Sequence, residues 1–396
     1  MTKTILLHSQ TDMDQTAIRI YFLTYGSLLG ALFLFLAAWW FQWWRKEKTV
    51  FYRIDEPNLV SFASLLGFFY FLVALGSEFD GWWHAAVGRD DFWILPHLVI
   101  IVSLSCLTLA TFFLLKKREL KNTRSLFFLT SCFLFEMGLY IGIALDDTAH
   151  NLFGQENIST PLVSLAPPHI FIGLCFLSIG FSLIGLVRAA CRREPERSFL
   201  HALIGGSMVS FAMYQYQPFW PLGIYRISGA FGQFLIMVII GIILSLLWRK
   251  ETRFLFAGFA LSMVVVVLEA IRMSGGGVDP NVPYPFVPFR IPSLFFYSSF
   301  LAAGIAIDMF RVWKSQVSEK QLALAGCIYG FTQAAFYYIP AKWWLDHKDI
   351  GFLLWPDVYF TIGFGLLGST LGFLIPWWSA PVVSFFNRAI FPAESD

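Results

Sequence analysis

Apolar runs of about 20 residues, the length at which a helix spans the hydrocarbon core of a bilayer, recur along the whole chain and constrain its fold. Because the runs are continuous, they exclude an outer-membrane barrel, whose strands alternate between apolar and polar residues. The composition also departs from that of a soluble globular protein, since 57% of the 396 residues are hydrophobic and only 14% are charged. We therefore predict an all-α fold, a polytopic transmembrane helix bundle.

The runs predict about 11 membrane spans, built from repeated helical hairpins. Most of the 28 Lys and Arg residues lie in alternate connections, which the positive-inside rule assigns to the cytoplasm. The N-terminus is then outside and the C-terminus cytoplasmic, and the polar residues 1–16 indicate a retained first span. The predicted spans are 18–44, 58–79, 96–115, 125–145, 168–188, 199–216, 227–248, 253–273, 291–310, 320–340 and 357–379.

One outer connection carries an acid and two histidines at metal-ligand spacing. Asp80 and His84 are four residues apart, so they share one face if the preceding run continues as a helix. Pro96 suits the first turn of the next helix, and His97 follows it directly. A carboxylate and two imidazoles can therefore meet at the end of a hairpin as a three-ligand metal set. The alternative is a structural polar pair between Asp80 and His84 near the membrane surface.

A second outer connection repeats this order of residues. Asp146 precedes His150 by four residues, and Pro167 and Pro168 precede His169. Four of the seven histidines thus lie at two hairpin ends, which favours a metal site over structural pairing. We predict that the ligands form one polar cluster, lined by Phe and Trp, in the outer half of the membrane. They are Asp80, His84, His97, Asp146, His150 and His169.

Other polar residues have simpler interpretations. Two later outer connections, 274–290 and 341–356, resemble degenerate copies of the hairpin and are expected to supply no ligand. His347 is predicted to be exposed, and Glu136, in mid-span, is interpreted as a buried hydrogen-bonded acid rather than a proton relay. The five cysteines include no CxxC motif and are expected to be free thiols, mostly buried.

Three regions follow from this pattern. Residues 1–57 form the N-terminal tail and first transmembrane helix, 58–197 the metal-binding hairpin region, and 198–396 the C-terminal transmembrane helices with degenerate hairpins. The net charge of +2 is too small to indicate nucleic acid as a partner.

The first hairpin end also carries a specific set of residues: Glu78, Asp80, Trp83, His84, Arg89, Asp90, Phe92 and His97. In this set and spacing it resembles the C subunit of particulate methane monooxygenase and ammonia monooxygenase, of the copper membrane monooxygenase superfamily. The second hairpin end is similar in kind, with Asp146 where the family has Asn, then His150, and His169 after an Ala-Pro-Pro sequence. The likeness covers about residues 58–180.

This resemblance implies a copper-binding membrane protein, one subunit of an oxidising complex that acts on a small apolar substrate. Whether the chain is itself a copper-dependent monooxygenase stays open. The resemblance also implies other membrane subunits and an electron donor as partners, besides membrane lipid, and the bacterial inner membrane as the location. By themselves the ligand types also suit iron or zinc.

Two other functions fit the same residues. A membrane metal-handling or transport protein would explain the repeated hairpins, although no line of Cys, Met or His continues from the ligands to the cytoplasm. A haem-b electron carrier would use the four histidines as axial ligands, but haem needs no carboxylate.

The charge asymmetry predicts that the connections 116–124 and 188–197 share the cytoplasm. Cysteines placed at Lys121 and Glu194 should therefore be protected from an impermeant thiol reagent in intact cells. Ready labelling of both positions from outside would reverse the orientation.

Overall fold

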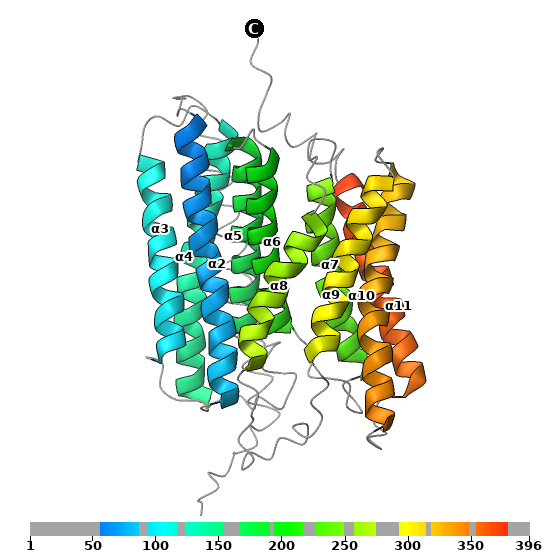
Figure 1. Ribbon diagram of the computed structural model, residues 1–396. Helices are drawn as coiled ribbons and strands as arrows, with labels where there is room; N and C mark the ends of the chain where they lie inside the picture. Colours follow the sequence, from blue (N-terminus) through cyan, green and yellow to red (C-terminus); the bar gives the residue numbers. More distant parts are fainter. Residues whose placement is uncertain are drawn as a thin grey trace, which may run out of the picture.

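The computed structural model describes the chain at 56–86, 94–116, 123–153, 167–190, 194–216, 226–248, 257–274, 293–313, 318–347 and 354–378. These residues form ten α-helices that stand roughly side by side as one bundle (Figure 1). The helices are α2 Glu56–Ala86, α3 Leu95–Lys116, α4 Thr123–Phe153, α5 Pro167–Ala190, α6 Glu194–Tyr216, α7 Arg226–Trp248, α8 Ala257–Ser274, α9 Ser293–Trp313, α10 Glu319–His347 and α11 Trp355–Trp378.

Seven of these helices are long and apolar enough to cross a membrane: α2, α3, α4, α5, α9, α10 and α11. Shorter apolar stretches lie in α6, α7 and α8. Large apolar side chains on the outside of α3, such as Val102 and Phe113, indicate contact with membrane lipid. The all-helical, multi-pass prediction is thus confirmed for the described residues, while the predicted span 18–44 lies outside them.

The two helices that carry the predicted acids continue further than the sequence predicted. The spans expected to end at 79 and 145 extend to Ala86 in α2 and Phe153 in α4. Asp80 and Asp146 therefore lie inside helices, because no proline interrupts either run and a continuing helix satisfies its own backbone hydrogen bonds.

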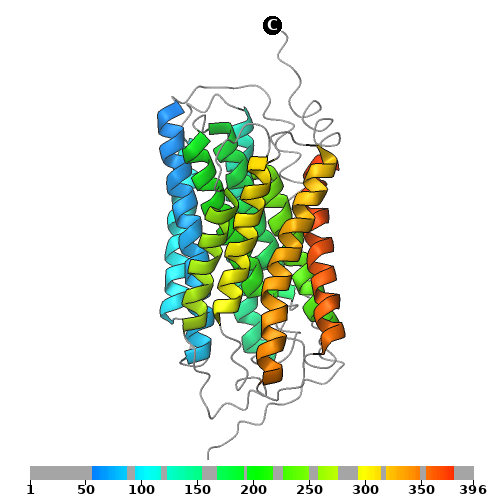
Figure 2. The same ribbon diagram turned by 45° about the vertical axis from the view of Figure 1, so that its right-hand side comes forward.

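The helices that carry the predicted ligands pack as one group. α2 lies against α3, α5 and α6, and α4 lies against α3 and α5. The remaining helices form a second group around α10 and α11, with α8 packed between α6 and α9 (Figures 1 and 2).

A stack of three aromatic rings joins α2, α5 and α6. Phe176 lies between Tyr70 and Phe211, with ring centroids 4.3 Å and 3.9 Å away. The Tyr70 hydroxyl donates a hydrogen bond of 3.0 Å to the Phe176 carbonyl oxygen. Gly180 makes room for this contact, since a Cβ atom there would lie 2.6 Å from the Tyr70 oxygen. The stack fixes α2 against α5 in the interior of the bundle.

Glycines let the helices of the second group approach closely. A Cβ atom on Gly241 of α7 would lie 2.6 Å from the Ser369 carbonyl oxygen of α11. One on Gly372 of α11 would collide with the Val238 carbonyl oxygen of α7. Membrane helices pack well through small residues because apolar burial gives no preference for protein over lipid.

Gly372→Ala should therefore lower the free energy of unfolding by about 1–3 kcal/mol, because the methyl group meets backbone that cannot move aside. Gly363→Ala, on the same helix, is the matched control, since a Cβ atom there has nothing within 4 Å. Thermal unfolding of the two variants in detergent compares them. Equal stabilities would contradict the close packing of α7 and α11.

Candidate metal centre

The first hairpin brings an acid of α2 against a histidine of α3. His97 Nε2 lies 3.1 Å from Asp80 Oδ1. The Asp80 side chain is 9% exposed and that of His97 28%, so the pair lies at the edge of the packed interior. The sequence alternative paired Asp80 with His84 on the same helix, whereas this contact crosses the hairpin.

The start of α3 places His97. Leu98 N donates a hydrogen bond of 3.1 Å to the Ile94 carbonyl oxygen, which begins the helix there. Pro96, in the first turn, loses no helical hydrogen bond and is buried. His97 is thereby held in the first turn, facing the last turns of α2.

The second hairpin repeats the contact with the same atoms. His169 Nε2 lies 3.1 Å from Asp146 Oδ1, and the two side chains are 17% and 20% exposed. His169 is the third residue of α5 and follows Pro168, just as His97 is the third residue of α3 and follows Pro96.

A glycine and an isoleucine set the spacing of the helices in both hairpins. Gly76 lies four residues before Asp80, and a Cβ atom there would lie 2.7 Å from Cγ1 of Ile100. Gly142 lies four residues before Asp146, and a Cβ atom there would lie 2.8 Å from Cγ1 of Ile172.

The two hairpins therefore share more residues than the aspartate, the histidines and the proline. In both hairpins it reads G-x-x-x-D-x-x-x-H, then P-H-x-x-I. The glycine and isoleucine were a visible signal, but among so many apolar residues only the contact between them showed their role.

The two remaining predicted ligands are placed by their backbone alone. His84 and His150 lie in α2 and α4, one helical turn after Asp80 and Asp146, while their side chains lie outside the described residues. Among the His, Cys, Asp and Glu side chains that the structure describes, no three are grouped to hold one metal ion. The cluster of six ligands stays a prediction.

The interior near the first pair holds another acid. Glu78 is completely buried and accepts a hydrogen bond of 2.6 Å from the Ser210 hydroxyl of α6. Phe79, Trp82 and Trp83 form an aromatic cluster on either side of Asp80 in the sequence. These contacts fix the end of α2 against α6 and surround it with aromatic rings.

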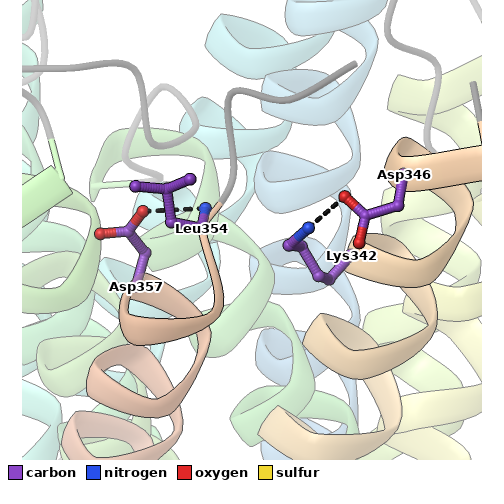
Figure 3. Close-up of polar contacts among 4 residues, drawn as sticks. All are labelled: Lys342, Asp346, Leu354 and Asp357. Atoms are coloured by element: carbon purple, nitrogen blue, oxygen red, sulfur yellow. Dashed lines mark hydrogen bonds and ion pairs between the residues drawn. The ribbon is translucent and has the colours of Figure 1, made fainter. Parts of the chain in front are cut away.

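The α10–α11 connection follows a different arrangement (Figure 3). Asp346 pairs with Lys342 of its own helix. Lys342 lies four residues before Asp346, which is the position that glycine takes in the other two hairpins. Asp357 follows Pro356 where the others have histidine, and its carboxylate accepts a hydrogen bond of 3.0 Å from Leu354 N, which caps α11. In this hairpin Asp346 is neutralised by a lysine of its own helix, and not by a histidine of the next helix.

Other predicted polar residues are partly confirmed. His347 is exposed and stacks on Trp343, as expected for a surface residue. Glu136 is a buried acid with hydrogen-bond partners, and Cys106, Cys132, Cys175 and Cys327 are free. The connection 274–290 lies almost wholly outside the described residues.

Two other polar side chains are held between helices. His201 is 2% exposed, and its Nε2 lies 3.3 Å from the Ile184 carbonyl oxygen. Asp308 accepts hydrogen bonds from Gly258 N and Phe259 N and so caps α8 from the side of α9. Such contacts between helices leave no periodic trace in the sequence.

Comparison of the chain with protein-family models, with curated proteins and with solved structures finds no match.

The contacts predict that each acid is energetically coupled to the histidine of its own hairpin in the metal-free protein. In a double-mutant cycle, Asp80→Asn and His97→Gln should deviate from additivity by about 0.5–3 kcal/mol, because each removes the other's partner. An additive Asp80–His97 cycle would contradict this. The cross-pair cycle of Asp80→Asn with His169→Gln measures whether the two pairs also couple with each other, as members of the predicted cluster would. Equal coupling in both cycles would indicate one merged cluster.

Proposed function

We propose that this chain is an integral membrane copper-binding protein, one subunit of an oxidising complex that acts on a small apolar substrate. The observation that carries the proposal is the matched pair of hairpins, in which the same atoms of Asp80–His97 and Asp146–His169 lie 3.1 Å apart. We infer that the hairpins are copies of one metal-binding unit.

The spacing of each pair fits a shared metal ion. Imidazole nitrogen and carboxylate oxygen bind first-row metals at about 2.0–2.2 Å, so two ligands at angles of roughly 90–110° lie about 3 Å apart. The contacts of 3.1 Å have this length. An ordinary acid–histidine pair has it too, so the support comes from the repetition and from a further histidine one turn away in each hairpin.

A third ligand in each hairpin comes from the helical spacing. His84 and His150 follow the acids by four residues on helices that continue past them, which puts each on the same face as its acid. Each hairpin then offers one carboxylate and two imidazoles, and a fourth position stays open for substrate or oxygen.

Copper is favoured over iron and zinc by the family resemblance of the first hairpin end. When bound, the metal would supply the redox chemistry. The chain itself would hold the ion through its acids and histidines, with the aromatic side chains of Phe79, Trp82 and Trp83 beside Asp80. As the family resemblance implies, an electron donor and other membrane subunits would complete the complex.

The haem alternative fits these contacts less well. Haem needs no carboxylate ligand, whereas His97 and His169 each lie beside an aspartate.

Metal analysis of the purified protein tests the proposal. The wild type should bind copper, and His97→Ala and His169→Ala should each lose about one ion per chain, since each removes one of three ligands from a separate hairpin. His347→Ala is the matched control, because this histidine is exposed and stacks on Trp343.

Optical and electron paramagnetic resonance spectra identify the bound species. Copper(II) should give a paramagnetic signal without a Soret band, and a Soret band would indicate haem. Unchanged metal content in both His97→Ala and His169→Ala would reject these ligands.

A further inference from the structure

A completely buried acid, Glu136, faces α3 from the middle of α4. Its Oε1 atom accepts hydrogen bonds from the Thr111 hydroxyl, at 2.9 Å, and from the Cys132 thiol, at 3.1 Å. Its Oε2 atom is also buried, yet it has no hydrogen-bond partner among the described residues. A carboxyl group whose only role was structural would be expected to use both oxygens.

The described neighbours of Glu136 donate hydrogen bonds but carry no positive charge. No Lys, Arg or His among the described residues forms an ion pair with it. Burying an ionised carboxylate in an apolar interior without a cation is costly, so the neutral acid fits these contacts better. The proton of the neutral acid is then expected on the Oε2 atom of Glu136, which accepts no hydrogen bond from the described residues.

Thr111 can respond to a change at Glu136. Its hydroxyl oxygen lies 2.9 Å from Glu136 Oε1 and 3.0 Å from the Leu107 carbonyl oxygen. A hydroxyl has one proton to donate and two lone pairs to accept. Thr111 can therefore donate to an ionised Glu136, or turn its proton to Leu107 and accept from a protonated one.

Further hydroxyl groups continue the line along the α3–α4 interface. Tyr140, one turn after Glu136, donates a hydrogen bond of 3.0 Å to the Ser105 hydroxyl of α3. Thr108, between Ser105 and Thr111 on α3, lies beside the Glu136 carboxyl group. The line runs towards the end of the bundle that holds the acid–histidine pairs, since α3 begins and α4 ends there.

We propose that Glu136 is a proton-exchange site inside the membrane, reached along the α3–α4 interface through Tyr140, Ser105 and Thr108. The site takes up and releases a single proton at its carboxyl group. It does not depend on metal binding by the hairpins, so its failure and that of the copper proposal are separate results.

Infrared spectroscopy of the full-length protein in lipid tests the proposal. At neutral pH the spectrum should contain a carboxylic acid C=O band that is lost in Glu136→Gln. Transfer to D₂O should shift this band within minutes, because the proton exchanges with solvent. Tyr140→Phe should slow that shift by an order of magnitude or more, since it removes one relay group. Tyr359→Phe, on the exposed face of α11, should not.

Thr111→Val keeps the test decisive if Glu136→Gln does not fold. It leaves the carboxyl group but removes one hydrogen bond, so the band should move to higher frequency. Absence of any band that responds to Glu136→Gln or Thr111→Val would mean that Glu136 is ionised, which overturns the proposal. A band that D₂O leaves unshifted would show a sealed structural acid and would also overturn it.

Discussion

A carboxylate inside an apolar helix bundle is stable only with a proton, a cation or several hydrogen-bond donors beside it, and this requirement explains the contacts of the acids that the structure describes. Asp80 and Asp146 each face a histidine, Asp346 faces Lys342, and Asp308 accepts two backbone N–H groups. Among the described residues, Glu136 accepts hydrogen bonds from a hydroxyl and a thiol group and faces no cation. The acids thus differ in what neutralises them, and the difference separates structural sites from candidate functional ones.

Close helix packing produces the same acid–histidine contact in both ligand hairpins. In both ligand hairpins a glycine four residues before the acid lets an isoleucine of the next helix approach, which brings the histidine to its aspartate. In the α10–α11 hairpin Lys342 stands at that position and takes the acid for itself. The presence of lysine in place of glycine at this position therefore accompanies a change in pairing. The acid pairs across the hairpin where glycine is present and within its own helix where lysine is present.

Much of this arrangement could be predicted from the sequence, because apolar length determines spans and Pro-His marks the first turn of α3 and α5. The convergence of Asp80 and His97 at the hairpin end was predicted as well. Which histidine contacts Asp80 directly could not be predicted, because it depends on how closely α3 approaches α2. The hydrogen bond of 2.7 Å between Gln233 of α7 and Gln333 of α10 escaped prediction for the same reason, since it depends on how distant segments pack.

The most direct test of the central claim is the X-ray absorption spectrum of copper bound to the purified protein. The account predicts a shell of nitrogen and oxygen ligands at about 2 Å with the outer-shell scattering of imidazole rings, and loss of the bound copper itself in the double variant His97→Ala, His169→Ala. A shell dominated by sulfur at about 2.3 Å would place copper on the cysteines. That result would contradict the assignment of the two hairpins as the metal-binding unit.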